Sequence, residues 1–148
     1  MKIGSKKPQV VLYLNGDKPT LPNDYQHLRG AELSQAILLS NNNNWRKILT
    51  LFAKLTAPDD DWRSYLHRHL LAEQQISFNQ ELLATASKHI IAGKSNWQRF
   101  GAYFQEDSAI HQRKRIYFSN NRLFTPYLDY RQFPNNLVAD CRQLLYPH

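Results

Sequence analysis

The longest apolar run of the chain lies within Gln9-Val10-Val11-Leu12-Tyr13-Leu14-Asn15, which leads directly into Gly16-Asp17-Lys18-Pro19. Its apolar residues are β-branched, aromatic or aliphatic, and the residues that follow are strong turn formers. An uninterrupted apolar run of this length is typical of a strand buried on both faces, as in a parallel sheet. We therefore expect a central strand here, with a loop at its carboxyl end.

Several later segments carry apolar residues at helical spacing. We expect helices over residues 30–40, 45–56 and 62–75, and a last helix that opens at residues 134–136 and ends before Pro147. Asn43 or Asn44 can cap the second helix, and Asp59-Asp60-Asp61 supplies a cap and negative charge to the third. Ser77-Phe78-Asn79-Gln80 has the spacing of a capping box and predicts another helix start.

Residues 82–93 have two interpretations. They form one helix capped by Gly93, or the helix ends near Ser87 and residues 89–92 form a short buried strand. The second is slightly favoured, because Gly93-Lys94-Ser95-Asn96 would then be a strand-to-helix turn before a helix over residues 97–104.

The last third of the chain predicts a hairpin. Residues 105–112 read as a polar loop, residues 115–119 and 122–125 as strands, and Asn120-Asn121 as the tight turn between them. The order of strands and helices then predicts one α/β domain over residues 1–148, helix-rich, with a short, mostly parallel sheet flanked by several helices. Ligands bind such folds at the carboxyl ends of the strands, so we expect residues 15–20, residues 93–96 and the chain from Ser119 onward to converge.

Composition narrows the function classes. The chain has 19 Lys and Arg against 12 Asp and Glu, a formal charge of +7, which favours polyanion partners. Its longest apolar run is far shorter than the roughly 20 residues of a membrane span, and no signal peptide is visible, so we expect a cytoplasmic protein without a membrane partner. The single cysteine, Cys141, excludes an internal disulfide and is expected to pack as a small hydrophobic residue.

The most biased segment lies between residues 113 and 134, with three tyrosines, three phenylalanines and five cationic side chains. Cations that follow phosphates and rings that stack on bases are typical of surfaces that bind single-stranded nucleic acid or a flipped base. The residues we expect to contact DNA or RNA are Arg113, Lys114, Arg115, Arg122, Tyr127, Tyr130 and Arg131.

The same segment allows another function. Because Pro126 and Pro134 bracket Tyr127, Tyr130 and Phe133, we expect at least two of these rings to be partly exposed. The three rings would then form an apolar patch for a protein partner or for self-association. Alternatively, part of the segment is ordinary strand core with solvated edges.

Other candidate chemistry is sparse. Asp17 could position a water molecule as a catalytic carboxylate, although a turn residue needs no such role. His67 and His69 lie roughly 200° apart on a helix, so no metal site is expected. Gly93-Lys94-Ser95 lacks the earlier glycine of a phosphate-binding loop, and no cofactor is expected. The remaining candidates lie on the predicted loops: Gly16, Pro19, Lys94, Asn96 and Asn120.

Three short segments carry a family resemblance: Gly16-Asp17-Lys18-Pro19, Ile90-Ile91-Ala92-Gly93-Lys94 and residues 125–131. In this order they resemble the Gly-x-x-Pro loop, the strand ending in Gly-Lys and the DNA-entering loop of the uracil-DNA glycosylase superfamily, an α/β fold with a short parallel sheet. The resemblance implies a DNA partner and Asp17 as the residue that activates water. Residues 125–131 contain no histidine, and Thr20 replaces the usual aromatic residue or glycine. Both an enzyme and a non-catalytic relative therefore remain open.

Overall fold

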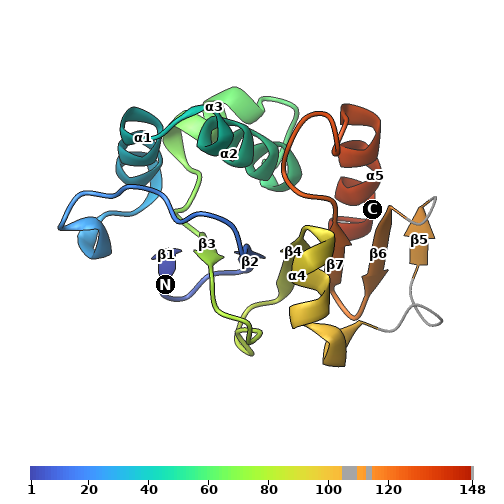
Figure 1. Cartoon of the computed structure of the whole chain (residues 1–148). Coiled ribbons are helices and arrows are strands. Elements are labelled where there is room, and N and C mark those ends of the chain that lie inside the picture. The colour runs from blue at the N-terminus through green and yellow to red at the C-terminus, as the bar shows by residue number, and fades with distance from the viewer. Residues whose placement is uncertain (105–109, 113–114, 148) are drawn as a thin grey trace.

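The computed structural model describes residues 1–104, 110–112 and 115–147, and within these ranges seven strands form one sheet (Figure 1). Their order across the sheet is β1-β3-β2-β4-β7-β6-β5. The strands are β1 (Lys2–Gly4), β2 (Val10–Tyr13), β3 (Gln74–Ser77), β4 (Lys88–Ala92), β5 (Ile110–Gln112), β6 (Ile116–Ser119) and β7 (Arg122–Thr125).

The sheet is mixed. Strands β3, β2, β4 and β7 run parallel to one another in its centre. Strand β1 is antiparallel to β3 at one edge, and β6 and β5 continue antiparallel beyond β7 at the other. The molecule is thus an α/β protein, but the expectation of a mostly parallel sheet holds only for the four central strands, since half of the pairings between the described strands are antiparallel.

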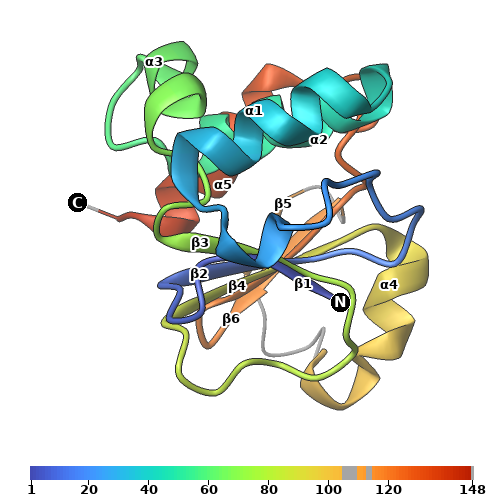
Figure 2. The same cartoon turned by 90° about the vertical axis from the view of Figure 1, so that its left-hand side faces the viewer.

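The described helices cover the sheet unequally, as Figures 1 and 2 show. Four of them lie over one face, and α4 lies on the other. The helices are α1 (Gly30–Ser40), α2 (Asn43–Thr56), α3 (Trp62–Arg68), α4 (Lys94–Arg99) and α5 (Asn135–Leu145), with short 3-10 turns η1 (Tyr25–His27) and η2 (Gly101–Tyr103).

Strand β2 confirms the expected central strand. It is paired on both sides and completely buried. Its side chains alternate: Val10 and Leu12 join the larger core beneath the four helices, while Val11 and Tyr13 join a smaller core on the α4 face. An uninterrupted apolar run was needed because this strand has no solvent-facing side.

Side-chain caps explain where two helices begin. Asn42, rather than Asn43 or Asn44, caps α2, and its Oδ1 accepts a hydrogen bond from Asn44 N at 3.0 Å. The expected cap of α3 is confirmed, since Asp61 Oδ1 accepts from Ser64 N at 3.1 Å. Each carboxamide or carboxylate satisfies a first-turn N–H group that would otherwise lack a partner.

The expectation of a helix over residues 62–75 is wrong in its second half. Helix α3 ends at Arg68, and β3 begins at Gln74. Gln74 and Gln75 look unsuited to a buried strand, but Gln74 Oε1 accepts from Leu71 N and Gln75 Nε2 donates to Ser5 O. The predicted capping box at Ser77 is also wrong, because Ser77 belongs to β3.

Two other regions correct the predicted elements. Strand β4 confirms the second interpretation of residues 82–93, although no helix forms over residues 82–87. Helix α4 begins at Lys94, three residues before the predicted start. Gly93 makes the turn with φ +90°, a conformation that side-chain-bearing residues rarely adopt. Strands β1 and β5 were not predicted, and β5 replaces part of the expected polar loop.

The predicted hairpin and last helix are confirmed. Asn120 and Asn121 both have positive φ, 53° and 60°, as a two-residue turn between twisted strands requires. Helix α5 occupies the expected place. In the described part of the chain, no helix combines the length and apolar character that crossing a membrane would need.

Candidate functional site

The loops after β2 and β4 meet at the carboxyl edge of the parallel strands. Asn15 Nδ2 donates to Ser95 Oγ at 3.2 Å, which ties the first loop to the start of α4. The chain leaves β2 towards β3 and leaves β4 towards β7, on opposite sides. This edge is therefore the switch point where ligands bind in open α/β sheets, and the expected convergence of these two loops is confirmed.

The third converging segment begins later in the chain than the expected Ser119. Arg122, the first residue of β7, pairs with His89 near the start of β4, so Asn120 lies at the amino end of the parallel strands. The loop that reaches the carboxyl edge instead follows β7, where Gly93 N donates to Thr125 O at 2.9 Å. A β-hairpin reverses the chain, so the end of β6 and the end of β7 point in opposite directions.

Tyr127 is the contact between the three loops. A Cβ atom at Gly16 would lie 3.4 Å from the Tyr127 hydroxyl, and one at Gly93 would lie 3.7 Å from its Cδ2 atom. Burial raises the pKa of Tyr127, and the negative charges of Asp17 and Asp129 raise it further. Tyr127 therefore stays a neutral hydroxyl beside the Asp17 carboxylate.

A polar cleft of about 520 Å³ opens beside Tyr127. Its lining is rich in carboxamides and hydroxyls: Asp17, Lys18, Thr20, Ser40, Asn41, Asn42, Asn44, Trp45 and Tyr127. Asn41 fixes one wall, because it accepts from Thr20 N at 2.7 Å and donates to Thr20 O at 2.9 Å. The cleft thus presents both hydrogen-bond donors and acceptors beside an exposed carboxylate.

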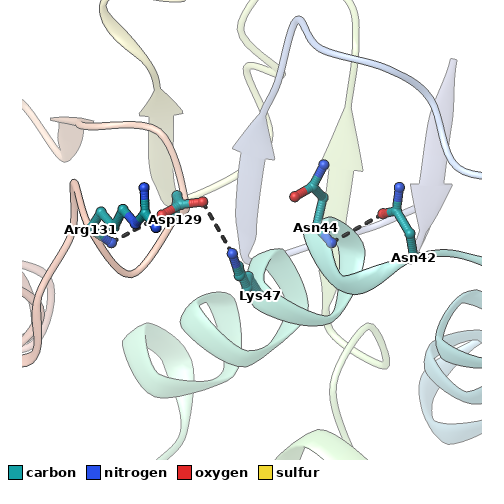
Figure 3. Close-up of polar contacts among 5 residues, drawn as sticks. All are labelled: Asn42, Asn44, Lys47, Asp129 and Arg131. Carbon is teal, nitrogen blue, oxygen red and sulfur yellow. Dashed lines mark hydrogen bonds and ion pairs between the residues drawn. The ribbon is translucent and has the colours of Figure 1, made fainter.

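An ion pair involves Lys47 of α2, the helix whose first residues line this cleft (Figure 3). Asp129 accepts from Arg131 N at 3.0 Å, and Lys47 Nζ lies 3.5 Å from its carboxylate. The Arg131 N–H group and the Lys47 charge lower the pKa of Asp129. This is the one ion pair between side chains in the described ranges, so most of the Lys and Arg side chains there have no direct carboxylate contact.

Tyr130 is the most exposed ring of this region. Its side chain is 44% exposed, and the ammonium groups of Lys47 and Lys54 each lie 5.8 Å from its ring centroid. Neither lysine is among the residues that the sequence led us to expect at a nucleic-acid surface. Lys47 and Lys54 are seven residues apart and therefore lie on one face of the predicted helix, which begins with the solvent-exposed Arg46 and Lys47. This spacing was the feature of the sequence that could have indicated them.

The rings of the 126–134 loop divide between surface and core. Tyr127 is half-buried and Tyr130 is exposed, which confirms that at least two rings are partly exposed. Phe133, however, is 1% exposed and packs in the larger core. The three-ring apolar patch is therefore wrong, because one of its members faces inward.

The predicted cations also divide. Arg115 lies at the start of β6, on the carboxyl edge, and donates to Gln132 O. Arg131 is exposed on the same side. Arg122 lies at the amino end, with its guanidinium 4.9 Å from the Tyr103 ring centroid. Arg113 and Lys114 lie outside the described residues.

The remaining candidates have mixed surroundings. Lys94 and Gly16 are exposed at the edge, while Pro19 is buried. Asn96 is completely buried; its Nδ2 donates to Tyr13 O at 2.9 Å and its Oδ1 accepts from Arg99 at 3.1 Å. Asn96 therefore holds α4 against β2 and cannot reach a ligand from that position.

Cys141 behaves as a packing residue. Its side chain is buried in the core, and burial raises the pKa of the thiol. Within the described ranges, no group of three or more His, Cys, Asp and Glu side chains is arranged to hold a metal ion.

Comparison with protein-family models identifies a family for this chain but no activity. Residues 1–146 match the model of a family described as a family of unknown function, DUF6942. No curated protein and no solved structure matches the chain.

Proposed function

Because the chain belongs to the DUF6942 family, whose description names no activity, function has to be inferred from its own surface, and we propose that it binds nucleic acid at the carboxyl edge of the parallel strands. One observation carries the proposal. The exposed Tyr130 ring has two lysine ammonium groups 5.8 Å from its centroid, and it lies in the loop after β7 that also carries Arg131 and accepts a hydrogen bond from Arg115 at Gln132 O. Exposed rings offer bases a stacking surface, and neighbouring cations attract phosphates.

The charge balance supports a polyanion rather than an apolar partner. Among the described residues, the large apolar side chains that are exposed are Leu39 and Tyr130, and Tyr130 already has two cations against its ring. A protein-interaction surface needs a contiguous apolar centre. Phe133 would have supplied part of that centre, but it is buried.

A glycosylase-like role is a narrower form of the same proposal. The three segments that resemble the uracil-DNA glycosylase superfamily, residues 16–19, 90–94 and 125–131, are brought together around Tyr127. Asp17 is exposed and lines the polar cleft there. If the role carries over, Asp17→Asn abolishes release of uracil from a single-stranded oligonucleotide and leaves binding intact. Unchanged release, or no release by the unaltered protein, would remove this form of the proposal.

The general proposal is tested by the salt dependence of binding. Labelled single- and double-stranded oligonucleotides are titrated with the protein across a salt series, and affinity is followed by fluorescence anisotropy. We expect a steep loss of affinity with salt and a shallower slope for Arg131→Gln, with Arg122→Gln as the matched control at the opposite end of the strands. Absence of binding even at low salt would overturn the proposal, and an equal effect of Arg122→Gln would move the site.

A further inference from the structure

A strip of cations and rings extends from the loop after β7 across α2 to α3. We call it the cation–aromatic strip, and it consists of Lys47, Lys54, Trp62, Arg63 and Tyr130. Lys47 and Lys54 lie 5.8 Å from the Tyr130 centroid. Lys54 also lies 4.9 Å from the Trp62 centroid, and Arg63 lies 4.7 Å from it. Lys54 therefore joins the two rings.

Helix geometry places the two lysines on one face. They are seven residues apart, two turns of α2, and so about 10.5 Å apart along its axis. Asp61 caps α3 so that Trp62 and Arg63 form its first turn, next to the end of α2. The contacts of the strip thus alternate between cations and rings, from Lys47 to Tyr130 to Lys54 to Trp62 to Arg63.

Lys54 is unusually placed for a surface lysine. Its ammonium donates to Asn135 Oδ1 at 3.0 Å and has no carboxylate partner among the described residues. Burial and the nearby Arg63 charge lower its pKa. Asp59 and Asp60 line the shallow pocket beyond it, so the strip is bounded by negative charge at that end. An anion bound between Lys54 and Arg63 would relieve the repulsion between these two cations.

Trp62 differs from the other tryptophans. Trp45 and Trp97 are buried, whereas Trp62 is only partly buried. Trp45 and Trp97 also contact other rings, while the ring interactions described for Trp62 and Tyr130 are with cations. Trp62 also packs in part against the larger core, so the surface it keeps for a ligand is its solvent-exposed part.

We propose that the cation–aromatic strip binds single-stranded nucleic acid, with one base on Tyr130, another on Trp62, and the backbone phosphates on Lys47, Lys54 and Arg63. The proposal rests on the nucleic-acid binding proposed above and names the form of the partner. Both rings lie within 5.8 Å of the same Lys54 ammonium, so two nearby bases can stack on either side of one phosphate contact. A duplex keeps its base faces stacked and offers this strip its phosphates alone.

The test replaces ring surface while keeping apolar volume. Trp62→Leu/Tyr130→Leu is compared with Tyr146→Leu, because Tyr146 has the same kind of contact, Lys88 at 5.1 Å, outside the strip. Affinities for a short oligothymidine and for a duplex of equal length are measured by anisotropy, after circular dichroism has shown that each variant is folded. We expect the double variant to bind the single strand about tenfold more weakly or worse, and the control to bind like the unaltered protein.

The outcomes separate the two proposals. If the unaltered protein binds neither oligonucleotide, the proposed function fails. If it binds both equally and the double variant binds the single strand as before, the strip proposal fails while nucleic-acid binding stands. Should the double variant not fold, Lys54→Gln decides instead: the slope of log affinity against log salt for the single strand falls by about 0.7, and an unchanged slope overturns the proposal.

Discussion

Two groups of aromatic rings occupy opposite sides of the sheet and have opposite surroundings. On the α4 face, Trp97, Phe104, Tyr117 and Phe124 contact one another, with centroids 5.0 to 6.1 Å apart. Over the other face, Tyr130 and Trp62 contact lysine and arginine side chains. The first group is packed ring on ring inside the protein and stabilises the fold, whereas Tyr130 is exposed and Trp62 packs against the larger core only in part, so both keep surface for binding.

The difference is instructive because both groups draw on one stretch of sequence. Tyr117 and Phe124 face each other across the β6–β7 hairpin and are buried, while Tyr130 follows a few residues later and is exposed. Composition alone treats the three rings alike. Strand alternation and the proline after Thr125 distinguish them, since the strand ends there and the loop turns to the edge.

The largest expected difference between the two groups of rings is in their contribution to the free energy of unfolding. Phe124→Ala removes a buried ring from the α4-face group and is expected to cost about 3–5 kcal/mol of unfolding free energy. Tyr130→Ala is expected to change it by less than about 0.5 kcal/mol. Urea unfolding of both variants measures the contrast. Similar losses would show that Tyr130 is a structural residue.

The buried pair of Tyr13 and His89 on the α4 face leads us to expect that stability depends on pH. The Tyr13 hydroxyl accepts from Leu83 N at 2.9 Å and lies 2.8 Å from His89 Nδ1. Because the hydroxyl has one hydrogen to donate, it suits a neutral imidazole whose Nδ1 accepts that hydrogen. Burial, and then the Arg122 charge, lower the pKa of His89, although a backbone hydrogen bond at Ala86 opposes this, and burial raises the pKa of Tyr13 to about 12.

The sign of that dependence follows from linkage. As pH falls below about 6.5, the unfolded chain binds a proton at His89 before the folded protein does, so stability is full above that pH and declines down to the folded pKa. Urea unfolding from about pH 8 to about pH 5 should show the decline. His89→Gln should be less stable at neutral pH and lose part of the slope, and a slope identical to that of the unaltered protein would exclude His89 as its source.

A smaller effect is expected on the salt dependence of single-strand binding. Lys47→Gln removes a cation from the strip, and Lys88→Gln removes one beside Tyr146. We expect the first change to lower the salt slope of single-strand binding by about 0.7 and the second to leave it unaltered. Equal slopes for both variants would mean that overall charge, rather than the strip, attracts the oligonucleotide.

The smallest expected effect is a gain in affinity for single-stranded nucleic acid. Asp129→Asn removes the carboxylate that pairs with Lys47 at the edge of the strip. Because a partly exposed ion pair contributes little in water, we expect affinity for a single strand to rise by about twofold to threefold. Anisotropy at low salt resolves this change, and weaker binding would indicate that Asp129 orients Lys47 for its ligand.

Sequence reasoning found those parts of the fold that local patterns encode. Strand β2, helices α1 and α5 and the Asn120-Asn121 turn follow from apolar periodicity and turn chemistry. Strand β3 could not be found this way, because Gln74 and Gln75 are buried through hydrogen bonds to Leu71 and Ser5 that exist only in the folded sheet. The predicted ends of some elements were also wrong by a few residues, as at the start of α4.

The candidate site was predictable only in part. That loops after parallel strands converge is a rule of the fold, and the loops over residues 15–20 and 93–96 do meet, whereas Ser119 lies at the opposite end of the strands. The contribution of α2 and α3 depends on how these helices cross the sheet, which brings Lys54 to Trp62 and Tyr130. No local pattern carries that information.

The most direct test of the account is photo-crosslinking of an oligonucleotide that contains 5-iodouracil, followed by mass spectrometry of the modified peptides. We expect adducts on Tyr130 and Trp62 that an excess of unlabelled single strand suppresses. Adducts confined to Tyr103 or Tyr146, which have cation contacts outside the strip, would contradict it, as would the absence of any adduct at low salt.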